Sequence, residues 1–161
     1  MSEKLTLGWR EWVALPDLAI PAIKAKVDTG ARTSALHAID IEPFTRDEQP
    51  WVRFAVHPVQ KHRDLKIQCE APVVEQREIM DSGGHRETRF VVNTQLQLGA
   101  QKKLIELTLT CRYGMRFRML LGRTALKPDV VCDPGTSYKL GRVNTRKIYR
   151  SSTVNLGSAA S

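Results

Sequence analysis

The sequence is short of several features that would assign it to a familiar class. Its 161 residues include only three cysteines, Cys69, Cys111 and Cys132, and none of them forms a C-x-x-C pair. An odd number of scattered cysteines does not fit a disulfide framework, so we expect buried free thiols. The chain has no apolar run long enough to cross a bilayer and no charged start followed by an apolar leader. These absences predict a cytoplasmic protein without a membrane segment.

Motifs for binding metals and nucleotides are missing as well. There is no H-E-x-x-H sequence, and the four histidines do not pair with carboxylates at helical ligand spacing: His37, His57, His62 and His85. The chain also lacks the G-x-x-x-x-G-K loop that cradles nucleotide phosphates. We therefore expect neither a metal nor a cofactor.

Positive charge is in excess, because 25 Lys and Arg residues oppose 17 Asp and Glu residues and give a net charge of +8. This surplus favours acidic partners, although a basic surface can also serve solubility alone. Basic residues interleaved with aromatic ones can indicate nucleic-acid binding. Here aromatic residues make up only 6%, and Trp9, Trp12 and Trp51 fall in strand patterns typical of a core. We therefore expect that nucleic acid is not a partner.

Alternation of apolar and polar residues with a period of two dominates the chain and predicts an all-β fold. The predicted strands cover Trp9–Leu15, Ile23–Val27, Trp51–Val56, Phe90–Leu98, Ile105–Cys111 and Phe117–Leu121. Gly99-Ala100 is expected to join two of them in a hairpin. Short helical turns are candidates at Thr33–Ala38 and after a cap at Thr124, the second ending before Pro128.

The last part of the chain differs from the rest. It contains Arg142, Arg146, Lys147 and Arg150, and it ends in a serine-rich stretch. Such a composition is typical of a frayed terminus. We predict one mostly-β domain, a compact barrel or sandwich, over residues 1–141, and a basic, flexible tail over residues 142–161.

The sharpest local motif is Asp28-Thr29-Gly30-Ala31, which directly follows the alternating stretch Ile23–Val27. The strand would deliver Asp28 to a tight turn, where Gly30 permits close approach of backbone. The same residues also fit an ordinary Asx turn in which the glycine serves geometry alone. The tripeptide is short enough to arise by chance, so a second motif has to decide between these readings.

That second motif lies far downstream, where the apolar stretch Phe117–Leu121 runs into Gly122-Arg123-Thr124-Ala125-Leu126. An Asp-Thr-Gly-Ala loop followed much later by apolar residues and Gly-Arg resembles the retropepsin-like aspartic proteases. In that family the late strand passes beside the catalytic loop and braces it. The resemblance implies a single retropepsin-like acid-protease lobe, which is closed and barrel-like with a flap hairpin and one short helix.

A narrower resemblance is to the bacterial family known as ATP-dependent zinc proteases, whose members are often associated with RimK-type glutamate ligases. It rests on Asp28–Ala38, on Ser82-Gly83-Gly84 with Glu87 and Arg89, and on Gly114–Leu126. Neither zinc nor ATP, the two components of that family label, has a motif in this sequence. A zinc-dependent peptidase stays open as the alternative that the label names.

The chemistry of peptide hydrolysis explains the motif. Without a metal or a covalent nucleophile, one carboxylate has to polarise water while another donates a proton. Two close carboxyls share one proton, because both cannot easily ionise. The chain has a single Asp-Thr-Gly, and its nearest variant, Asp81-Ser82-Gly83, follows no apolar strand. We therefore expect a homodimer in which Asp28 of a second copy completes the site. By resemblance, Thr29 would lock the two loops together and Gly30 would line the cleft.

Met80–Asn93 is the best candidate for the flap, because Ser82, Gly83 and Gly84 lie between two strand-like stretches. A flap closes over substrate and excludes water. The same pattern also fits an ordinary hairpin turn, and the resemblance favours the flap.

One departure from the viral retropepsins bears on specificity. They carry an acidic residue two positions after the loop glycine, where it pairs with the later arginine, and this chain has Arg32 there. With Ala31 and Arg123 beside it, the substrate side of the loop would be positive and suited to carboxylates. This predicts an acidic peptide or protein as the substrate, for example a glutamate-tailed ribosomal protein. Pairing of Arg32 with Asp133 or Glu42 is the alternative and would remove the specificity argument.

A second class of function uses the same scaffold without catalysis, as a module that binds acidic peptides. The presence of Asp28 favours the enzyme, because a carboxylate repels an acidic ligand and serves a binder no evident purpose. A dyad that holds a proton eases this repulsion, which predicts highest activity below neutral pH.

Overall fold

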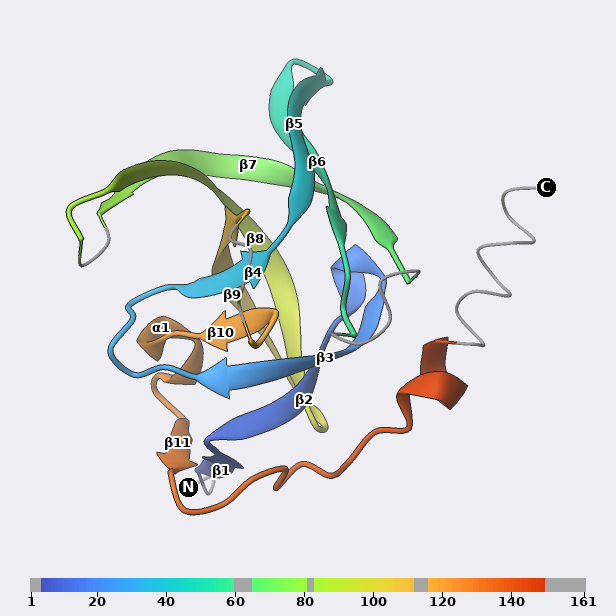
Figure 1. Ribbon diagram of the computed structural model, residues 1–161, viewed down its shortest axis with the longest axis vertical. Helices are drawn as coiled ribbons and strands as arrows, with labels where there is room; N and C mark the ends of the chain where they lie inside the picture. Colours follow the sequence, from blue (N-terminus) through green and yellow to red (C-terminus); the bar gives the residue numbers. More distant parts are fainter. Residues whose placement is uncertain (1–3, 60–64, 81–82, 112–115, 150–161) are drawn as a thin grey trace.

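A computed structural model describes residues 4–59, 65–80, 83–111 and 116–149, and these ranges are mostly β-strand (Figure 1). The strands are β1 (Leu5–Gly8), β2 (Arg10–Leu15), β3 (Ile20–Val27), β4 (Ser34–His37), β5 (Ile39–Arg46), β6 (Gln49–Val56), β7 (Ile67–Met80), β8 (Arg86–Leu98), β9 (Gln101–Thr110), β10 (Met119–Leu121) and β11 (Val130–Asp133). The helical segments are a 3-10 turn η1 (Pro16–Leu18), the short α1 (Arg123–Leu126) and a turn at residues 145–149. The all-β prediction is confirmed.

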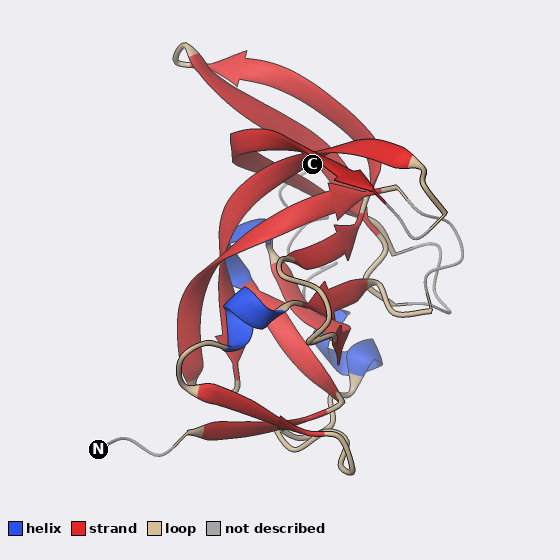
Figure 2. Ribbon diagram, turned by 90° about the vertical axis from the view of Figure 1, so that its left-hand side faces the viewer, coloured by secondary structure: helices blue, strands red, loops and turns tan. Residues whose placement is uncertain are grey.

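Nine strands form one sheet in the order β2-β3-β10-β4-β9-β8-β7-β6-β5. The sheet curls until β2 also meets β8, where Ala14 pairs with Gln97, so the strands close into a barrel (Figure 2). A second, two-stranded sheet pairs β1 in parallel with β11. The β5–β6 hairpin projects from the barrel (Figure 1), and the long β7–β8 hairpin arches over the side of the molecule on which β3 ends.

The alternation seen in the sequence places one face of each strand in the core. Its largest fully buried side chains include Leu15 and Ile23 from the N-terminal strands, Phe54 from β6, and Leu36 and Met119 from the pair β4–β10. Fully burying such a side chain contributes about 1.5–3 kcal/mol. The core therefore fixes β3, β4 and β10 against one another, and these are the strands that surround the Asp28 loop.

Several predicted elements are corrected. Thr33–Ala38 contains strand β4 instead of a helical turn, because Ser34–His37 pair with β9 on one side and β10 on the other. Helix α1 begins after Gly122, and the Thr124 hydroxyl binds the Arg32 carbonyl instead of capping the helix. The predicted hairpin at Gly99 is confirmed by the pairing of β8 with β9.

Residues 142–149, the described part of the predicted tail, contact the barrel, and the flexibility of the tail stays a prediction. Val143 and Ile148 pack against the core, and residues 145–149 are helical. Tyr149 is only 4% exposed, and its hydroxyl donates to the carbonyl of Ala22 and accepts from the amide of the same residue. A buried ring with both hydrogen-bonding functions used holds this segment on β3. The domain boundary at residue 141 stays a prediction.

The three thiols are free, but only Cys69 is buried, whereas Cys132 is half-buried and Cys111 is exposed. Burial raises the pKa of Cys69 to about 12, which keeps it an inert thiol. No helix in the described ranges is both long and apolar enough to cross a membrane.

Candidate active site

Asp28 stands at the start of the loop between β3 and β4, where the sequence placed it. Its backbone amide donates to the carbonyl of Leu121 at 2.8 Å, and its carbonyl accepts from the Ala31 amide at 3.1 Å. The Gly30 amide donates to Asp28 Oδ1 at 3.1 Å, and the carboxylate is half-exposed. The loop is therefore a tight turn that presents a hydrogen-bonded carboxylate to the surface.

Strand β10 braces this loop from below. It lies between β3 and β4, with Leu121 opposite Val27 and Leu120 opposite Ala35. Directly after it, the Arg123 amide donates to the carbonyl of Ala31 at 2.8 Å. The late apolar-Gly-Arg segment thus passes beside the Asp28 loop, as the resemblance implied.

Gly122 is required at the crossing. A Cβ atom on this residue would lie 2.6 Å from the carbonyl carbon of Thr33, which is backbone and cannot yield cheaply. The Gly122 amide donates to the buried Ser34 hydroxyl at 3.0 Å. Only glycine lets the two loops approach this closely, so the glycine of the late motif has a steric role.

The side chain of Arg123 binds the backbone of the Asp28 loop. Its Nη1 donates to the carbonyls of Thr29 and Gly30, each at 3.1 Å. In the viral pattern an acidic side chain forms an ion pair with this arginine. In this chain Arg32 stands at the position of that acidic residue. Loop carbonyls therefore replace the carboxylate, and the direct role of Arg123 toward a substrate stays a prediction.

Arg32 is exposed, and within the described ranges its side chain makes no hydrogen bond or ion pair. The alternative partners Asp133 and Glu42 are not bound to it. Asp133 Oδ1 accepts instead from the Gly135 amide at 2.9 Å. The guanidinium of Arg32 thus stands beside the Asp28 loop without a counter-ion in the described part of the chain.

The predicted flap is a long hairpin of β7 and β8, paired from Val73 with Val92 out to Met80 with Arg86. Gly83 and Gly84 lie exposed at its tip, and Gly84 has a φ of +84°, a value that favours glycine. Ser82 lies outside the described residues. The tip and the end of β3 lie on the same side of the molecule (Figure 1).

Arg77 joins the hairpin to the Asp28 loop, a contact that the sequence pattern did not reveal. Its Nη1 donates to the Thr33 hydroxyl at 3.2 Å, and its Nη2 binds Glu75 and, at 3.4 Å, Glu106 of β9. Hydrogen bonding to Glu75 is the main cause that raises the pKa of Arg77. The hairpin is thus fastened, at Arg77, to the residue that precedes β4.

Zinc, which the family label suggested, finds no suitable donors in the described ranges, because no three His, Cys, Asp or Glu side chains gather there. Burial lowers the pKa of His37, and the nearby charges of Arg118 and His57 lower it further. An arginine beside an imidazole disfavours a second cation. His62 lies outside the described residues.

A closed β-barrel with a glycine-tipped hairpin and an Asp-Thr-Gly loop braced by a later Gly-Arg strand defines a retropepsin-like acid-protease lobe. Residues 6–142 match the RimB-like family, described as "Retropepsin-like aspartic endopeptidase RimB", and the chain belongs to that family. A solved structure of a protein of unknown function from Legionella pneumophila has the same fold, with a TM-score of 0.71 and 27% identity over 84% of this chain and 98% of that one.

Closer relatives in sequence are much longer proteins. A "Probable alpha-L-glutamate ligase" of Parasynechococcus marenigrum is 51% identical over 141 residues, which cover 88% of this chain and 30% of the relative. A protein of the same name from Shewanella halifaxensis is 47% identical over 141 residues, covering 88% and 31%. The chain therefore spans less than a third of the length of these relatives.

Proposed function

We propose that the chain is an aspartic peptidase that works as a homodimer and hydrolyses peptide bonds in acidic, glutamate-rich polypeptide. The observation that carries this proposal is the braced, half-exposed carboxylate of Asp28 on a retropepsin-like lobe that has one Asp-Thr-Gly loop. Thr29 is exposed, and its hydroxyl makes no hydrogen bond in the described part of the chain. In the proposed dimer, that hydroxyl would contact the loop of the second copy.

In the proposed reaction, two Asp28 carboxyls face each other across the twofold axis and share one proton. The ionised carboxylate takes a proton from water, and the water oxygen bonds to the carbon of the scissile carbonyl. The protonated carboxyl then donates its proton to the leaving nitrogen as the carbon–nitrogen bond breaks. Arg123 keeps the carbonyls of Thr29 and Gly30 in place, and so holds the carboxylate in position.

Two observations support an acidic substrate. Arg32 carries a positive charge beside the loop without a counter-ion in the described ranges. Relatives carry a matching region within longer proteins named probable alpha-L-glutamate ligases, so a peptidase acting on added glutamates would oppose the reaction that their name describes. A glutamate-tailed ribosomal protein is one polypeptide of this kind.

The test incubates the purified protein with a glutamate-tailed peptide, with and without EDTA, and follows products by mass spectrometry. Asp28→Asn should abolish cleavage, whereas the matched variant Asp40→Asn should cleave normally, because Asp40 is exposed on β5 and paired with Lys66. Activity should be highest below neutral pH, and a flat profile between about pH 5 and 8 would count against the shared proton. Loss of cleavage with EDTA would restore the zinc alternative, and binding without cleavage would restore the binding module.

Mixing active and Asp28→Asn protein tests the dimer directly. If each site needs two aspartates and subunits exchange freely, an equal mixture retains about a quarter of the activity of the same total amount of active protein. Retention of half, under conditions in which labelled subunits are seen to exchange, would show that each copy works alone.

A further inference from the structure

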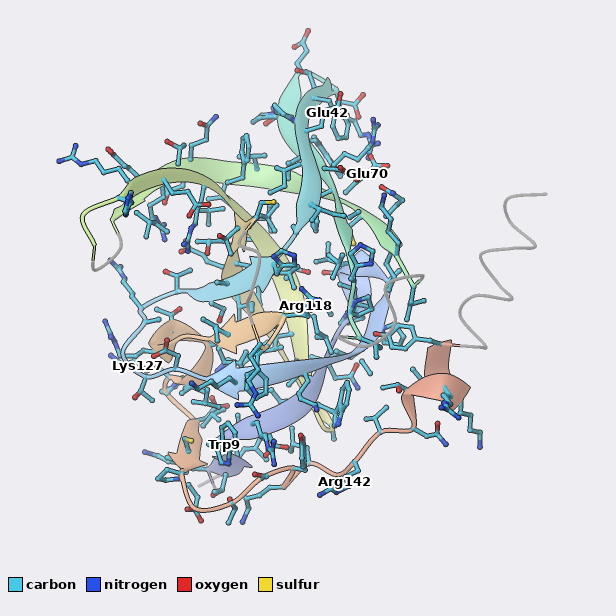
Figure 3. The ribbon with its side chains drawn as sticks, in the orientation of Figure 1. Trp9, Glu42, Glu70, Arg118, Lys127 and Arg142 are labelled. Carbon is cyan, nitrogen blue, oxygen red and sulfur yellow. The ribbon has the colours of Figure 1, made fainter. Side chains whose placement is uncertain are left out.

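A strip of basic side chains runs along the outer face of the β2–β3 ribbon. Arg10 pairs with Lys26 and Trp12 pairs with Lys24 across the two strands, and directly opposed residues share a face. Arg142 joins them from the C-terminal segment, since its guanidinium lies 4.9 Å from the centre of the Tyr138 ring. We call Arg10, Lys24, Lys26 and Arg142 the basic strip. Figure 3 shows Arg142 and Trp9 at the same end of the molecule.

The strip has no acidic partner in the described part of the chain. Basic side chains on other elements do, as Arg46 has Glu70 and Lys103 has Asp129. Placing two like charges opposite each other on neighbouring strands is normally destabilising, and this ribbon does so with Arg10 and Lys26. Four neighbouring cations without a counter-ion are the arrangement expected of a surface that receives an anion.

The nearest carboxylate does not neutralise the strip. Glu11 lies on the opposite, buried face of β2 and is 0% exposed. Its two oxygens accept from the backbone amides of Gly8, Lys139 and Leu140. Its charge is therefore committed to the segment beneath, and the four cations remain available at the surface.

Aromatic rings hold three of these cations in place, namely Arg10, Lys24 and Arg142. Arg10 lies 4.6 Å from the Trp9 ring centre and 4.9 Å from that of Tyr138. Lys24 lies 5.2 Å from the ring centre of Trp12 and 5.8 Å from that of Tyr138. Such contacts fix a side chain without removing its charge. A ligand that binds here therefore meets cations that are already ordered.

The contacts between cations and aromatic rings also indicate which class of anion the basic strip can bind. Trp9 and Trp12 were expected in the core, and both are half-buried: Trp12 packs against the edge of the core from β2, and Trp9, which precedes β2, meets the Phe117 ring edge-on. Nucleic-acid sites with aromatic residues use free ring faces to stack bases. Here the protein's own cations lie over these rings. The strip is therefore better suited to carboxylates than to bases.

We propose that the basic strip is a second substrate-binding site, which holds an acidic stretch of polypeptide while another part of the same chain lies at Asp28. Lys24 and Lys26 are two residues apart on one strand, roughly 6.6 Å, which is also the spacing of alternate side chains in an extended acidic peptide. Strand β3 ends at Val27, directly before Asp28, so the strip leads to the catalytic loop. This inference rests on the proposed function and names the part of the substrate that lies outside the catalytic loop.

Binding is measured on the Asp28→Asn protein, so that no peptide is cut, using fluorescence anisotropy of labelled decaglutamate. Adding Lys24→Gln and Lys26→Gln should weaken the affinity about tenfold at low ionic strength, because each exposed ion pair contributes up to about fivefold. The matched control, Arg46→Gln with Lys66→Gln, also removes two cations but takes them from existing ion pairs on other elements. It should change the affinity by less than about twofold.

If decaglutamate binds the strip variant and its control with equal affinity, the proposal that the basic strip binds substrate is refuted. The proposal would also be refuted if decauridylate bound more tightly than decaglutamate and lost that affinity in the strip variant. The site would then serve nucleic acid. If the unsubstituted protein cleaves a glutamate-tailed peptide and the strip variant binds normally, the strip is refuted and the peptidase stands. If binding depends on the strip but no peptide is cut, the strip is supported and the peptidase fails.

Discussion

Replacing Glu11 with glutamine should destabilise the protein strongly, although it changes only one atom. The carboxylate is 0% exposed, and its Oε2 accepts from the amides of Gly8 at 2.6 Å and Lys139 at 2.9 Å. Its Oε1 accepts from Leu140 at 3.0 Å. These contacts tie β1 and β2 to the segment that carries Tyr138, more than a hundred residues later in the chain.

The magnitude follows from the acceptors that glutamine lacks. An amide keeps one oxygen and turns the other into a donor, so at least one backbone N–H is left facing another donor. Hydrogen bonds to a charged group contribute about 1.5–3 kcal/mol each, and a buried unsatisfied donor costs about 1–3 kcal/mol. With the remaining contacts weakened by loss of charge, Glu11→Gln should lower the free energy of unfolding by about 3–4 kcal/mol. In a domain of this size the melting temperature should fall by roughly 10 °C.

Urea unfolding measures the loss, and amide hydrogen exchange locates it at Lys139 and Leu140. Glu42→Gln is the matched control, because Glu42 is exposed on β5, and it should change stability by less than about 0.5 kcal/mol. A loss below about 1 kcal/mol in the Glu11 variant, with both amides still protected, would refute the assignment of Glu11 as the fastener of this segment.

Two further predictions concern the loop and the pH range. Gly122→Ala should abolish cleavage and lower the melting temperature, because the added methyl group meets the Thr33 backbone; retention of full activity would contradict the steric argument. Burial, Arg118 and His57 lower the pKa of His37, so the unfolded chain binds its proton more readily. The stability due to neutral His37 is present above about pH 6.5 and lost as pH falls below it. His37→Gln should flatten that decline, and equal slopes of melting temperature against pH would exclude His37 as its cause.

The sequence predicted the elements whose patterns are local. Alternation identified β3, which leads into Asp28, and the hairpin at Gly99. Two separate motifs identified Asp28, Gly30 and Gly122 as parts of one loop region. Patterns of this kind act over a few residues, because the two faces of a strand differ in burial.

The sequence did not predict the elements whose conformation depends on contacts with distant residues. Ser34–His37 looks helical in isolation, and the pairing of β4 with β9 and β10 overrides that preference. The contact of Arg77 with Thr33 leaves no spacing pattern, and neither does the docking of Tyr149 on Ala22. The contact of Lys24 with the Trp12 ring depends on the register that places the two residues opposite each other on β2 and β3.

The late position of β10 also sets an order of events during synthesis. Arg123 and the Thr29 carbonyl that it binds are 94 residues apart in sequence, and β10 has to enter between β3 and β4 to complete the sheet. Contacts between distant residues form late, and a chain folds as it emerges from the ribosome. A nascent chain that stops before residue 119 therefore carries the aspartate without the strand that braces its loop. The peptidase chemistry proposed here would switch on only when nearly the whole domain has been made, which protects the growing chain and its neighbours from premature cleavage.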